Sequence, residues 1–106
     1  MHKVISRQAV IDLEEIFVFI SDRSTIAIAD RVIDAIVDTC KLLSDYPEMG
    51  RRRPEYDSLG FEVRSLSEGS YLILYTIRSG LPLVARVFHG AQDISALQIF
   101  PLPGLN

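Results

Sequence analysis

The chain has few of the residues on which metal and cofactor chemistry depend. Its 106 residues include one cysteine, two histidines and no tryptophan. The single thiol, Cys40, excludes an intrachain disulfide, and one thiol with two scattered histidines does not supply a cysteine-based metal site. We therefore expect no metal and no cofactor.

Long apolar runs and low-complexity tracts are also missing from the sequence. No segment stays apolar over the roughly 20 residues that a transmembrane helix needs. The first residues, "MHKVISRQAVIDLEE", reach acidic positions before the apolar part of a signal peptide could form. With 48% hydrophobic and 24% charged residues, the composition is typical of one folded domain. We expect a soluble cytoplasmic protein without membrane contact.

Positive charge is sparse and consists mainly of arginine, since Lys3 and Lys41 are the only lysines. Residues 1–50 carry 5 Lys or Arg against 9 Asp or Glu, a net charge of -4. Residues 51–106 carry 6 against 5, a net charge of +1. Nucleic-acid binding normally needs a broad basic surface that neutralises several phosphates. The charge distribution therefore argues against direct nucleic-acid binding.

A short strand at residues 2–6 and then two amphipathic helices are expected in the N-terminal half. Apolar residues recur every three or four positions over about 7–20 and 25–44, a spacing typical of helices. Ser6 and Ser24 are candidate N-caps, because a serine hydroxyl can accept from the free amides of a first helical turn. The short connection between the two helices predicts an antiparallel hairpin.

Three strands are expected in the C-terminal half, at residues 61–67, 70–78 and 82–90. Short turns with Gly69 and Gly80 separate them, which predicts an antiparallel meander. The whole order predicts an α+β fold in which the helix hairpin covers one face of a small sheet.

The middle strand of this meander has apolar residues on both faces. We expect the face away from the helices to be covered by the apolar tail at 95–106 or by a partner. The domain itself is then expected to span residues 1–94.

Four sequence blocks, in this order, resemble the RelE/ParE superfamily of bacterial type II toxins, and specifically its ParE branch. A fifth segment, "QAVIDLEEIFVFI" at 8–20, is similar to the first helix of that family. The four blocks are "DYPEMGRRRPE" at 45–55, "VRSL" at 63–66, "SYLILYTI" at 70–77 and "ARVFHGAQDI" at 85–94.

The resemblance implies the toxin of a type II toxin-antitoxin system. Its partner would be a cognate antitoxin whose disordered C-terminal segment wraps the toxin. The implied target is DNA gyrase in the ParE branch and messenger RNA on the ribosome in the RelE branch. The family usually has an arginine where this chain has Gln92. A degenerate member that only binds its antitoxin and regulates its operon is therefore a third alternative.

Arg64, Arg86 and His89 are the minimal set that the strands offer to an RNA-cleaving toxin. RNA cleavage needs a general acid, a general base and cationic groups over the phosphate. His89 could act as acid or base because the pKa of histidine lies near neutrality. Neither lysine lies in the strand region. We therefore favour inhibition by protein binding over catalysis and assign no catalytic residue.

Arginines are also the main candidates for contacts with a partner protein, because guanidinium groups pair with carboxylates through two hydrogen bonds. The alternatives are a solvated loop for the three adjacent arginines, and ion pairs with Glu62 or Asp93 for the two arginines inside strands. The expected partner-binding residues are Arg51, Arg52, Arg53, Arg64, Tyr75, Arg86 and Phe88.

The last motif also has a structural interpretation. His89, Gly90 and Asp93 suit a turn at the end of the last strand, in which the Asp93 carboxylate accepts hydrogen bonds from backbone amides.

Overall fold

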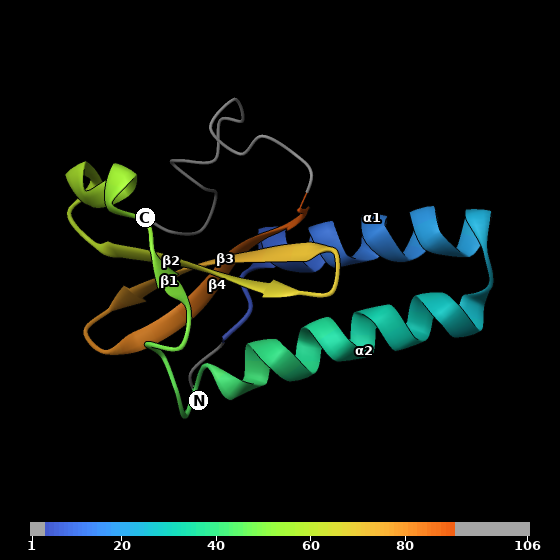
Figure 1. The fold of residues 1–106 in the computed structure, drawn as a ribbon, viewed down its shortest axis with the longest axis horizontal. Helices are drawn as coiled ribbons and strands as arrows, with labels where there is room; N and C mark the ends of the chain where they lie inside the picture. Colours follow the sequence, from blue (N-terminus) through green and yellow to red (C-terminus); the bar gives the residue numbers. More distant parts are fainter. Residues whose placement is uncertain (1–3, 91–106) are drawn as a thin grey trace.

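The computed structural model describes residues 4–90, in which two helices precede a four-stranded antiparallel sheet (Figure 1). This arrangement confirms the expected α+β fold. The elements are α1 (Arg7–Arg23), α2 (Ile26–Leu42), β1 (Arg51–Arg52), the 3-10 helix η1 (Pro54–Leu59), β2 (Glu62–Glu68), β3 (Tyr71–Arg78) and β4 (Leu81–His89).

The two helices form the expected hairpin, with one difference at the turn. The Ser6 hydroxyl accepts from the backbone N–H of Ala9 at 3.1 Å and so caps α1 as expected. Thr25, and not Ser24, caps α2 by accepting from the N–H of Ile28. Ser24 instead ends α1, because its own N–H donates to the carbonyl of Ile20. The connection is therefore shorter than expected.

The sheet has the order β1-β2-β3-β4, and its last three strands are the expected meander. β1 was not expected, because two residues cannot show a strand period. It pairs with β2 through Arg51↔Ser65 and Arg52↔Arg64. The 3-10 helix η1 was not expected either, and it begins at Pro54, where a fixed φ suits a first helical position.

The expected N-terminal strand is reduced to a single bridge in the described residues. Ile5 pairs in parallel with Val84 of β4, while residues 2 and 3 lie outside the described residues. The N–H of Ser6 donates to the carbonyl of Val84 at 2.9 Å. Because α1 begins at Arg7, the segment has room for only this pairing. It nevertheless covers part of the outer edge of β4.

The main core lies between the helix hairpin and one face of the sheet. Ile73 and Tyr75 of β3 face this core, whereas Leu72 and Leu74 belong to a smaller cluster on the other face, as the alternation predicts. The tail at 95–106, expected over that second face, lies outside the described residues. The buried members of the main core are Ala9, Leu13, Ile36, Cys40, Leu43, Ile73, Tyr75, Val84 and Val87.

Candidate protein-binding site

Arg86 connects β4 to α1. Its guanidinium donates to both carboxylate oxygens of Asp12, from Nε at 2.8 Å and from Nη2 at 3.0 Å. The same carboxylate accepts from the backbone N–H of Val87 at 2.9 Å, and the Asp12 side chain is only 5% exposed. Arg86 is therefore ion-paired inside the fold with Asp12 and not with Glu62, one of the two partners expected from the sequence. The other expected partner, Asp93, lies outside the described residues.

Arg64 is held in a similar way on β2. Its Nε pairs with the Glu62 carboxylate, one of the two partners expected from the sequence. Its Nη1 donates to two backbone carbonyls, of Gly50 at 2.8 Å and of Glu48 at 3.1 Å. The side chain is 15% exposed. Arg64 thus fastens the loop that follows α2 to the sheet.

Tyr75 fastens the same loop from the adjacent strand. Its hydroxyl donates to the carbonyl of Pro47 at 2.7 Å and accepts from the N–H of Gly50 at 2.9 Å. Burial raises the pKa of Tyr75 above its ordinary value, and the hydrogen bond from Gly50 opposes this effect. A Cβ on Gly50 would lie 2.6 Å from the Tyr75 hydroxyl oxygen, so only glycine fits there. We call Arg64, Tyr75 and Gly50 the loop clamp.

The three adjacent arginines are more accessible but differ from one another. Arg53 is half-buried and donates from Nε to the Ser65 hydroxyl at 2.8 Å. Arg52 is exposed and lies 3.3 Å from the Asp57 carboxylate. Arg51 is also exposed and makes no ion pair with any residue in the described part of the chain. Arg51 and Arg52 therefore present the most accessible positive charge among the candidate contacts.

The end of β4 carries the remaining candidates. His89 is exposed, and its ring meets that of Tyr71 edge-on, with centroids 5.5 Å apart. The N–H of Gly90 donates to the carbonyl of Ser70. The backbone of Gly90 thus continues the pairing of β4 with β3. Asp93 and Gln92, to which the expected turn also extends, lie outside the described residues.

Two of the three candidate nuclease residues, Arg64 and Arg86, lie on opposite faces of the sheet. Register places Arg64 opposite Tyr75 and Arg86 opposite Leu74, two residues that belong to clusters on opposite faces of the sheet. Each guanidinium is committed to a different carboxylate. Tyr75 and Phe88, expected as partner contacts, are 0% and 4% exposed, which places both inside the fold.

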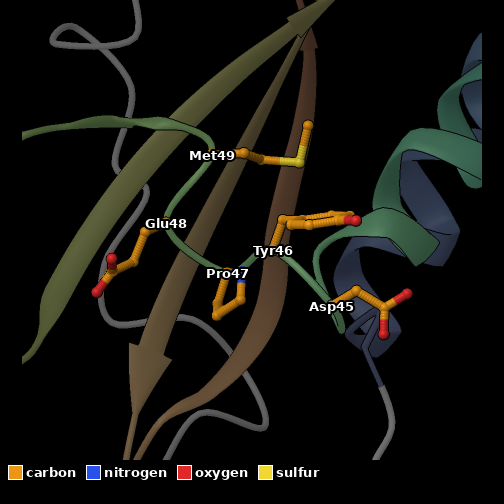
Figure 2. A pocket seen from close by; sticks show the side chains of 5 residues that line it. All are labelled: Asp45, Tyr46, Pro47, Glu48 and Met49. Carbon is orange, nitrogen blue, oxygen red and sulfur yellow. The ribbon is translucent and has the colours of Figure 1, made fainter.

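Two features of this region were missed by reasoning from the sequence. The partner of Arg86 is Asp12, 74 residues away, and no local spacing indicates such a pair. The loop at Asp45–Met49 lines an open hollow of about 420 Å³ (Figure 2). Tyr46 and Met49 in this loop are 62% and 43% exposed. Two large apolar side chains in a polar loop are the signal that could have indicated it.

Within residues 4–90, no helix is long and apolar enough to cross a membrane. The same residues hold no group of three or more His, Cys, Asp or Glu placed to bind a metal ion. A helix hairpin packed on a short antiparallel sheet, with Arg64 and Arg86 of the strands ion-paired to Glu62 and Asp12, defines a small α+β domain.

The family model described as the ParE toxin of the type II toxin-antitoxin system parDE matches residues 4–94. The match spans nearly the whole chain and makes the protein a toxin-class member of a toxin-antitoxin system. Within that class, the chain belongs to the ParE toxin family. None of the curated proteins is similar enough to the chain to count as a match.

Proposed function

We propose that this ParE-family chain inhibits DNA gyrase by binding it as a protein, and that a cognate antitoxin neutralises it in the cytoplasm. The proposal rests chiefly on what the strand arginines do. Arg64 and Arg86, which an RNA-cleaving toxin would need over the phosphate, are bound to Glu62 and Asp12. An inhibitor that acts by binding does not require either arginine to leave its carboxylate.

The cost of releasing them argues against the nuclease. Separating a buried, hydrogen-bonded ion pair leaves an uncompensated charge and costs several kcal/mol. Asp12 would lose two hydrogen bonds from Arg86. Arg64 would have to leave the carbonyls of Glu48 and Gly50 as well as Glu62. Acid–base cleavage by His89 would need a cationic group over the phosphate, and Arg64 and Arg86 are both held in ion pairs.

The antitoxin contact is proposed at Arg51 and Arg52 on β1. Both are exposed, and guanidinium groups bind the carboxylates of an acidic segment strongly. Arg53 extends this patch from a half-buried position. Residues 95–106 remain proposed as a tail that packs on the domain or on a partner.

The decisive experiment adds purified chain to a gyrase supercoiling assay and, in parallel, to a cell-free translation extract. We expect micromolar protein to stop supercoiling and leave translation intact. The reverse pattern would identify the mRNA endonuclease. No response in either assay would favour the degenerate member that only binds its antitoxin.

A further inference from the structure

The hollow at Asp45–Met49 is a surface feature that the proposed antitoxin contact does not use. Its lining residues come from one short loop after α2. Figure 2 shows the side chains of Met49, Tyr46 and Pro47 in one row, with those of Asp45 and Glu48 on either side of it. A tyrosine ring, a thioether and two acidic residues therefore line the same open space, and the carboxylates of Asp45 and Glu48 point outward on opposite sides of the row (Figure 2).

The hollow is formed before any partner arrives. The loop clamp fixes the carbonyls of Pro47, Glu48 and Gly50 through Tyr75 and Arg64. Side chains on a fixed backbone lose less conformational freedom when they bind, so less of the interaction energy is spent on ordering. The loop clamp is thus a positioning device for Tyr46 and Met49.

The chemistry of the border selects a cationic side chain. The face of a tyrosine attracts a guanidinium or ammonium group, and the apolar stem of arginine or lysine packs well against a ring and a thioether. Asp45 and Glu48 are exposed and form no ion pair with other residues of the described part. They can therefore bind such a cation without giving up an existing partner.

We infer that this hollow receives an arginine or lysine side chain from the surface of DNA gyrase, an inference that rests on the proposed function. An enzyme that handles DNA displays basic side chains for the phosphates. Residues 1–50 of this chain carry a net charge of -4, which complements such a surface. Arg64, whose guanidinium donates to the Glu48 carbonyl at 3.1 Å, is already paired with Glu62, and Arg52 is paired with Asp57.

The test compares three full-length variants with the parent in the supercoiling assay. Tyr46→Ala removes the ring, and the double change Asp45→Asn with Glu48→Gln removes both charges without removing volume. Leu81→Ala is the matched control, because Leu81 is also half exposed, at 50%, but lies at the start of β4, outside the loop that lines the hollow. Binding to the cognate antitoxin and thermal unfolding are measured for every variant.

We expect Tyr46→Ala to raise the concentration needed for half-inhibition of gyrase by about tenfold. The double variant is expected to weaken inhibition roughly threefold and to make it less dependent on salt, because charged pairs at exposed sites are screened. Leu81→Ala is expected to match the parent. All variants are expected to bind the antitoxin as the parent does.

The possible failures are distinguishable from one another. A folded Tyr46→Ala protein that inhibits gyrase as well as the parent overturns the role of the hollow and leaves the proposed function intact. A folded Tyr46→Ala protein that loses antitoxin binding assigns the hollow to the antitoxin and also overturns the inference. A parent protein that does not inhibit gyrase overturns the proposed function, and the inference with it.

Discussion

The carboxylate of Asp12 accepts hydrogen bonds from both Nε and Nη2 of Arg86, at 2.8 and 3.0 Å, and so joins the first helix to the last strand. It also accepts the backbone N–H of Val87 at 2.9 Å. The side-chain amide of Gln8 donates to the same carboxylate at 3.3 Å, so one short side chain accepts from four donors. Arg86, for which the sequence leaves open a partner contact or an internal ion pair, is part of what holds α1 against β4.

Replacing Asp12 tests this structural role. Asp12→Ala leaves the Arg86 charge half-buried without its partner and Val87 without an acceptor. We expect the free energy of unfolding to fall by about 3 kcal/mol, measured by urea denaturation. Asp30→Ala, at an exposed position of α2, is the control and should change it by no more than about 0.5 kcal/mol. Equal effects of the two changes would contradict the role assigned to Asp12.

Gly50 provides a test of the loop clamp. A methyl group there would lie 2.6 Å from the hydroxyl of Tyr75 and 2.8 Å from the carbonyl of Ser65. We expect Gly50→Ala to lower the free energy of unfolding by about 1–3 kcal/mol, as overpacking does. Gly60→Asn is the control, because Gly60 has φ 85° with open space around it, and asparagine tolerates that backbone. The control should cost less than Gly50→Ala.

Stability at alkaline pH depends on Cys40. Burial raises the pKa of the Cys40 thiol from 9.0 to about 11. Between these values the unfolded state has lost the proton and the folded state keeps it, so the free energy of unfolding falls as pH rises. Cys40→Ala should flatten this fall between pH 9.0 and about 11. A slope unchanged from the parent would show that the thiol ionises equally in both states.

The raised pKa of Tyr75 also lowers the free energy of unfolding as pH rises. Its phenol keeps its proton in the folded state above the ordinary pKa of 10.0, so it adds a further loss of stability above that pH. The Cys40→Ala protein should keep the loss of stability that Tyr75 causes. Measuring the free energy of unfolding of this variant and of the parent over one pH series therefore separates the effect of Cys40 from that of Tyr75.

His89 distinguishes binding from catalysis. If the protein inhibits by binding gyrase, His89→Ala should leave toxicity in growing cells within about twofold of the parent, since His89 lies at an exposed strand end and supplies no acid or base. Growth after induction is the measurement, and binding to the antitoxin is the control for folding. Complete loss of toxicity in a folded, antitoxin-binding His89→Ala protein would instead favour the mRNA endonuclease.

Arg51 tests the proposed antitoxin contact. We expect Arg51→Ala to weaken binding to the cognate antitoxin roughly twofold to fivefold and to reduce its salt dependence, since exposed charges contribute modestly and are screened. Titration calorimetry at several salt concentrations measures both. Arg31→Ala, at an exposed position of α2, is the control. Identical salt dependence in all three proteins would contradict a charged contact at Arg51.

Much of the fold follows from local patterns, and much of the site does not. Ser6 identifies the start of α1, and the alternation of Leu74 and Tyr75 assigns them to opposite faces of the sheet. Such features depend on neighbours in the sequence. The pairing of Asp12 with Arg86 and the closeness of Gly50 to Tyr75 depend on how distant elements pack. They become visible only in three dimensions.

The short strand at Arg51–Arg52 could not be predicted from the sequence pattern. Two residues are too few to show the alternation of apolar and polar side chains that is typical of a strand. Their pairing with Arg64 and Ser65 depends on where the loop clamp places the chain. The same placement explains why Arg51 and Arg52 remain exposed while Arg53 turns toward Ser65.

The outer edge of β4 is partly covered by the Ile5 bridge and by the Asp12 carboxylate, which accepts from the N–H of Val87. The opposite edge is formed by β1, which is only two residues long and carries two arginines. Open edges are where sheets of separate molecules join and aggregate. Within residues 4–90, one edge is partly occupied and the other begins with a short, charged strand. Both features disfavour the addition of a strand from a second copy of the chain.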